Sequence, residues 1–181
     1  GTVQLATLSN LVCTGVDAMV VKINSTGTNQ WSRKGEGVGD KETAYAIDAN
    51  SSGDVFITGS FEDKAWFGSG ASDTAIGVNN EDVFIAKYNT AGTIQWVKVG
   101  TNDDKAFGYG LALDGSSNVY ITGSFRLKDA VFGSDTLLSS KKNEDVFVAK
   151  LNSSGVFQWA KAAISDGASE GRSIDADTEG N

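Results

Sequence analysis

One motif recurs three times along the chain and constrains its fold more than any other feature. Asp is followed by Lys five residues later, Asn at seven, Gly at ten and Trp at fourteen, starting at Asp17, Asp82 and Asp145. A second pattern, which ends in Ile-Thr-Gly-Ser-Phe, aligns without a gap at 46–61 and 110–125. A fixed period is the signature of repeat architectures, in which units bury apolar surface against their neighbours. The chain is therefore predicted to be an array of units of about 63 residues.

Turn chemistry and side-chain alternation predict strands rather than helices. Residues 17–23 alternate with apolar side chains on both faces, and their copies at 82–88 and 145–151 do the same, which is typical of a strand covered on both sides. A four-residue turn that starts with Asn and ends with Gly follows each copy, as in hairpins. The chain has 22 Gly and no Pro, so an all-β fold is expected.

Each unit is predicted to hold four strands in up-and-down order, at 44–49, 55–61, 82–88 and 93–99 in the first complete copy. Repeated four-stranded antiparallel sheets indicate the blades of a beta-propeller. A linear β-solenoid is the alternative, but its coils are usually shorter and lack hairpin turns. The chain divides into a partial blade with its link (1–43), two complete blades (44–106 and 107–170) and the first strand of a further blade (171–181).

This division leaves one blade without its second strand, and an unpaired strand edge invites pairing with another strand. We therefore expect a segment of a larger propeller, completed by further chain or by another copy.

The two patterns together closely resemble the bacterial SBBP beta-propeller repeat. The resemblance rests on Ile57-Thr-Gly59 with Ile121-Thr-Gly123, and on Asp82-Val-Phe-Ile-Ala-Lys87 with the Gln95-Trp96 that follows. It covers nearly the whole chain. Proteins with such repeats are typically exported, so the resemblance implies an extracellular or bacterial cell-surface location.

A second, partial likeness is to the tryptophan-docking motif of quinoprotein propellers. It implies that the three repeated Trp side chains, Trp31, Trp96 and Trp159, pack between adjacent blades. The three repeated Lys side chains are interpreted as structural too: each is expected to pair with a carboxylate, for which the repeated Asp residues of a neighbouring blade are the candidates. These lysines are Lys22, Lys87 and Lys150.

Acidic side chains recur in the links between blades, at 35–43, 100–105 and 165–170, which we call the acidic links. Acid converging on the mouth of a propeller channel would suit a cation, and calcium is the candidate. The alternative is a solvated loop. Two further stretches, 48–53 and 175–180, match half of a calcium loop, but a plain hairpin turn is favoured because the Glu at position twelve is missing. The candidate ligands in the links are Asp40, Glu42, Asp103, Asp104, Asp166 and Glu170.

Charge and composition exclude several functions. A net charge of −8 argues against a nucleic-acid partner, and no apolar run reaches the roughly 20 residues that membrane insertion needs. There is no His, and Cys13 is the only Cys. Apart from calcium, no cofactor is expected, and the chain is predicted not to be an enzyme.

The predicted function is non-catalytic binding or scaffolding, with a protein or a glycan as partner. Variation concentrates at 62–81 and 126–144, which we call the long segments, and these are expected to form the binding face together with the acidic links. The aromatic and Arg side chains that interfaces favour are, in the long segments, Trp66, Phe67, Arg126 and Phe132. The alternative is a hydrolase or lyase that uses paired carboxylates on glycans at the propeller mouth.

Overall fold

The computed structural model describes residues 15–38, 41–68 and 73–181. Asp40 and Cys13 lie outside the described residues. The elements are twelve strands: β1 (Ala18–Ile23), β2 (Asn29–Gly37), β3 (Glu42–Ala49), β4 (Val55–Trp66), β5 (Thr74–Tyr88), β6 (Ile94–Asn102), β7 (Lys105–Leu113), β8 (Val119–Arg126), β9 (Ala130–Phe132), β10 (Asp135–Leu137), β11 (Glu144–Leu151) and β12 (Phe157–Ala163). The described residues include no helix long and apolar enough to cross a membrane.

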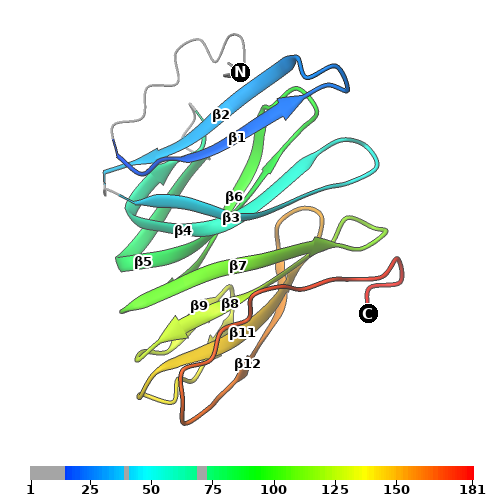
Figure 1. The fold of residues 1–181 in the computed structure, drawn as a ribbon. Coiled ribbons are helices and arrows are strands. Elements are labelled where there is room, and N and C mark those ends of the chain that lie inside the picture. Colours follow the sequence, from blue (N-terminus) through cyan, green and yellow to red (C-terminus); the bar gives the residue numbers. More distant parts are fainter. Residues whose placement is uncertain (1–14, 39–40, 69–72) are drawn as a thin grey trace.

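The strands fall into three successive units (Figure 1). Unit 1 holds β1 and β2, unit 2 holds β3 to β6, and unit 3 holds β7, β8, β11 and β12 with the small hairpin β9–β10. Within each unit, neighbouring strands pair antiparallel in sequence order. An all-β fold built of propeller repeats is therefore present, with the predicted up-and-down order in units 2 and 3.

The long segments are strands rather than free loops. In unit 2 they lengthen β4 and β5 beyond the predicted ends, and Ala65 and Trp66 pair with Gly37 and Glu36 of β2. In unit 3 the same region forms β9, which pairs with the end of β6 over residues 100–102. Each long segment thus adds strand pairing to the last strand of the preceding unit.

The core lies mostly between units. One apolar cluster joins β4 and β5 of unit 2 to unit 3 and includes Phe56, Ile85, Leu111 and Phe147. A second cluster joins unit 1 to the other face of unit 2 and includes Val20, Trp31 and Phe84. Because each strand of unit 2 contributes to both clusters, unit 2 depends on both neighbours for burial.

The array is not closed into a ring. Among the described residues β1 pairs only with β2, and β12 pairs only with β11. Residues 171–181, which were predicted to be the first strand of a further blade, form no ladder. They lie along unit 3, where the Gly171 N–H donates to Gly123 O at 3.2 Å and the Tyr120 hydroxyl donates to Gly180 O at 2.9 Å. A strand needs a partner, and these residues pair with none in the part of the chain that the structure describes.

Candidate functional site

Two of the three repeated Trp side chains, Trp31 and Trp96, lie in the seams between units. The indole N–H of Trp31 donates to Thr90 O of the next unit at 2.9 Å, and that of Trp96 donates to Ser153 O at 3.4 Å. A Cβ built on Gly92 would lie 2.6 Å from the Trp31 ring, and one on Gly155 would lie 2.8 Å from Trp96. Trp31 and Trp96 therefore each contact the next unit, the position that the docking role requires. Trp159 packs edge-on against Tyr120 of its own unit at 6.4 Å.

The repeated lysines are structural, but their carboxylate partners differ from those predicted. Lys87 Nζ lies 3.0 Å from Asp54 Oδ2, and Lys150 Nζ lies 3.9 Å from Asp114 Oδ2. Both acids belong to the turn between the first two strands of the same unit, not to the start of a third strand. Each ammonium also lies over an aromatic ring: Lys87 Nζ is 5.1 Å from the Phe56 ring centroid, and Lys150 Nζ is 4.7 Å from that of Tyr120. Lys22 instead donates to Thr90 O at 3.3 Å.

The repeated Asp residues, Asp82 and Asp145, accept hydrogen bonds from backbone N–H groups and do not pair with the repeated lysines. Asp82 is fully buried and accepts hydrogen bonds from Val78 N and Asn102 N, both at 2.7 Å. Asp145 is equally buried and accepts from Ser140 N at 2.6 Å and Ser165 N at 3.1 Å. In both units one carboxylate therefore joins a long segment to an acidic link.

Two of the four predicted binding anchors lie in the core. Phe67 and Phe132 are each 1% exposed, and their rings stack on Phe84 at 4.5 Å and Phe147 at 4.6 Å. A Cβ on Gly35 would lie 2.6 Å from the Phe67 ring, so the glycine of the preceding unit makes room for the aromatic. Both rings were predicted to be exposed for binding. They are buried instead, because each long segment pairs with the preceding unit and places its Phe in the core.

The other two predicted anchors remain partly exposed. Arg126 Nε donates to Asp104 Oδ2 at 2.7 Å, so an acidic link binds the end of β8. This hydrogen bond raises the pKa of the Arg126 guanidinium, while partial desolvation opposes it. Trp66 is half-buried at the end of β4, and the Lys64 ammonium lies 5.1 Å from its ring centroid.

The predicted acidic ligands that the structure describes, all but Asp40, form no cluster that could hold a metal ion. No group of three or more His, Cys, Asp or Glu side chains that could hold a metal ion occurs within the described part of the chain. Glu42 is buried at the start of β3 and Asp103 is exposed, while Asp104 is engaged by Arg126. Asp166 pairs with Lys142 at 2.5 Å, and Glu170 pairs with Arg172. The half-motifs at 48–53 and 175–180 form turns, closed by Gly53 N to Asn50 O at 2.9 Å and Gly180 N to Asp177 O at 3.1 Å.

A hollow of about 390 Å³ lies between units 2 and 3 on the face formed by the long segments and acidic links. Val78 and Val131 line it and are 52% and 40% exposed. Lys128 is exposed at its rim. Its floor is fixed because the Asn102 amide, which is buried, donates to Lys128 O at 2.6 Å and Asp129 O at 3.2 Å. Sequence reasoning missed these residues, since only the pairing of β6 with β9 brings them together.

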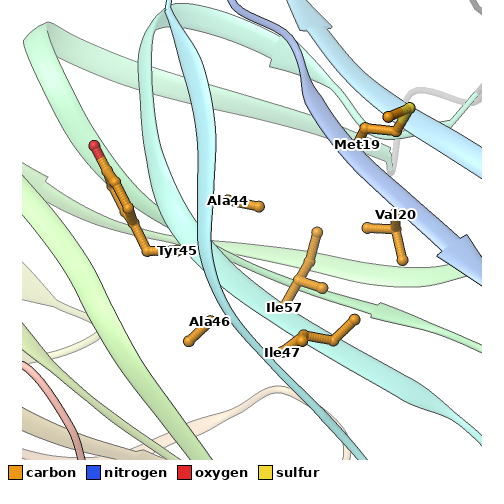
Figure 2. A pocket seen from close by; sticks show the side chains of 7 residues that line it. All are labelled: Met19, Val20, Ala44, Tyr45, Ala46, Ile47 and Ile57. Atoms are coloured by element: carbon orange, nitrogen blue, oxygen red, sulfur yellow. The ribbon is translucent and has the colours of Figure 1, made fainter. Parts of the chain in front are cut away.

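A second hollow, of about 410 Å³, is an apolar groove between β1 and β3 (Figure 2). Val20 lies on one side, Ala44 points toward it from the other, and Ile47 and Ile57 form the lower part. Tyr45 projects to the far side of β3, where its ring meets Tyr109 of the next unit edge-on at 5.1 Å. Ile47 is 60% exposed, although Ile57, its pairing partner in β4, is 1% exposed.

Comparison with known proteins supports the repeat. Residues 95–124 match the family model SBBP, which describes a beta-propeller repeat. The match begins in β6 and ends within β8. An uncharacterized WD repeat-containing protein, L264 of Acanthamoeba polyphaga mimivirus, is 27% identical over 169 residues, covering 84% of this chain and 12% of the viral protein. The chain carries an SBBP beta-propeller repeat and spans a small part of that relative.

Proposed function

We propose that this chain is a segment of a larger beta-propeller that binds a protein or a glycan without catalysing a reaction. The hollow between units 2 and 3 carries the proposal. It combines exposed apolar side chains, Val78 and Val131, with the exposed cation of Lys128 on a floor fixed by Asn102. Apolar and charged groups side by side on a rigid scaffold suit recognition of a partner surface.

The roles of the other charged groups support a non-catalytic function. Asp82 and Asp145 make equivalent backbone bonds in two units, and Lys87 and Lys150 make equivalent ion pairs. An active site needs a particular, asymmetric set of groups, whereas side chains that recur with the repeat serve the repeat. Location outside a bacterial cell or on its surface is proposed from the resemblance alone.

The test is a binding screen on arrays of glycans and extracellular protein fragments. We expect at least one ligand whose affinity falls about tenfold or more with Lys128→Glu or Val131→Ser, because substitution of a hot-spot residue costs about 2 kcal/mol or more. Val156→Ser is the matched control, since Val156 is 55% exposed in the turn between β11 and β12.

Three outcomes would contradict the proposal. If binding survives exchange of the two long segments between units 2 and 3, the site does not lie on these segments. A ligand lost with Val156→Ser but kept with Lys128→Glu would move it to the opposite face. Turnover of a glycan that Asp103→Asn abolishes would favour the hydrolase or lyase.

A further inference from the structure

The third strand of unit 1 has an open edge that its copies do not have. β5 pairs with β4 and β6, and β11 pairs with β8 and β12, each on both sides. β1 pairs with β2 alone in the part of the chain that the structure describes. Unpaired backbone donors and acceptors along a strand edge are a template for another strand.

The side chains beside this edge are uncovered in the same way. Ile47 of β3 is 60% exposed, whereas Leu111, its equivalent in β7, is 8% exposed and packs in the cluster that contains Phe56 of β4. Within the part of the chain that the structure describes, Lys22 forms no ion pair and covers no ring, and its ammonium donates to Thr90 O at 3.3 Å, whereas the Lys87 ammonium lies 5.1 Å from the Phe56 ring centroid. One absent strand accounts for both differences.

We propose that the edge of β1 and the groove beside it bind a β-hairpin of a further repeat unit, whose second strand has alanine where this chain has threonine. This rests on the proposed larger propeller and specifies its partner strand. The register of β4 on β5 pairs Phe56 with Lys87, Thr58 with Ile85 and Gly59 with Phe84. If the incoming strand takes the same register on β1, its equivalent of Phe56 lies opposite Lys22 and covers Ile47. Its equivalent of Thr58 lies opposite Val20.

The alanine follows from a difference between the units. The Thr58 hydroxyl donates to Phe84 O at 2.8 Å, and the Thr122 hydroxyl donates to Phe147 O at 2.8 Å. A Cβ on the facing glycine of the next unit, Gly108 or Gly171, would overlap these hydroxyls.

The residue that faces unit 1 at this position is Ala44, which already has a Cβ. Figure 2 shows its side chain pointing toward Val20. A threonine placed there as in the other units would overlap Ala44, and overpacking of this kind is costly. An incoming alanine has no γ atom and fits.

A second copy of this chain cannot supply the strand without unfolding. Its two strands with the required pattern are β4, which pairs with β3 and β5, and β8, which pairs with β7 and β11. The partner is therefore a hairpin from a unit other than those described.

The experiment uses two fluorescent peptides of residues 42–61, one native and one with Thr58→Ala, against the full chain and its Ala44→Gly variant. We expect the wild-type chain to bind the alanine peptide about fivefold or more tightly than the threonine peptide, which corresponds to the smallest typical cost of overpacking, about 1 kcal/mol. We expect Ala44→Gly to remove most of that preference. Ile47→Asp should abolish binding of both peptides, while Ile164→Asp, also at an exposed position, should not.

Because isolated hairpins are marginally stable, each hairpin is also fused ahead of Gly1 through a Gly-Ser spacer, which raises its effective concentration. The alanine fusion is expected to have the higher urea midpoint.

No binding and no rise in midpoint would overturn the docking. Equal affinities of both peptides for both chains would overturn the alanine requirement. A dimer of the free chain that the peptide does not dissociate would show that a second copy covers the edge. None of these results bears on array ligands whose binding Lys128→Glu abolishes. The proposed ligand site between units 2 and 3 and the proposed docking on β1 can therefore fail independently.

Discussion

Single glycines set the distance between units, and Gly100 illustrates this at the residue scale. A Cβ at this position would overlap the ring of Phe132, which is buried against Phe147. We expect Gly100→Ala to lower the free energy of unfolding by about 1–3 kcal/mol, because the ring cannot move aside in a packed seam. Urea unfolding measures it. Gly167→Ala is the control, since its nearest neighbour would be 4.0 Å away, and should change stability by less than about 0.5 kcal/mol. Equal effects would contradict the packing described.

Asp114 makes stability depend on acid pH. Burial would raise the pKa of this carboxyl, but hydrogen bonds from Asn118, Ser116 and Tyr120 outweigh burial and hold the pKa below its ordinary value of 3.8. The unfolded chain therefore takes up the proton first as pH falls. The stabilisation is complete above about pH 4 and is lost as pH falls through the folded-state pKa.

The corresponding prediction concerns Asp114→Asn. At pH 6 this change is expected to lower the free energy of unfolding by about 1–2 kcal/mol, because charge-assisted bonds are lost. At pH 3 the difference from wild type should be smaller. Urea midpoints at both pH values measure it, with Asp166→Asn at an exposed pair as control. A difference that grows toward acid would contradict the assignment.

At the scale of elements, the seam contact predicts unequal Trp substitutions. Trp96 donates to Ser153 O and packs on Gly155 of the next unit, whereas Trp159 contacts Tyr120 within its own unit. We expect Trp96→Ala to cost at least about 1 kcal/mol more than Trp159→Ala, because it loses a hydrogen bond and the packing on Gly155 of the next unit. Thermal and urea unfolding of both variants measure this. Equal losses would argue that the seam contributes little.

The same elements show what the sequence could predict. The up-and-down strands of units 2 and 3 follow from local patterns, because alternation and turn residues lie within one hairpin. The contact of Trp31 and Trp96 with the next unit follows from the resemblance to the tryptophan-docking motif. The partners of the long segments could not be predicted, because pairing of β9 with β6 joins different units and leaves no local pattern. The burial of Phe67 and Phe132 follows from that pairing, so both were misplaced on the surface.

Two smaller features also depended on three-dimensional context. Strict alternation would put Ala44 and Ala46 on one face, but the pairing shifts between them, so Tyr45 is a bulge and Ala44 faces the groove. The carboxylate that meets each repeated Lys sits at the end of one turn, Asp54, and at the start of the other, Asp114. Comparison of the copies therefore could not reveal it.

At the scale of the whole molecule, the units form an open array in which the middle unit is supported on both faces. Units 2 and 3 share one apolar cluster, and units 1 and 2 share the other. β1 and β12 are the outer strands, each paired on one side within the described residues. Local opening should therefore need least free energy at the two ends.

Amide hydrogen exchange followed by NMR tests this arrangement most directly, because protection reports which backbone groups are paired. The account predicts strong protection throughout 82–88 of β5 and in β8, which are paired on both sides. In β1 the amides that point away from β2 should exchange rapidly, and residues 171–177 should exchange faster than β7. Uniform protection along β1, equal to that of β5, would contradict the open edge and with it the account of this chain as an unclosed piece of a propeller.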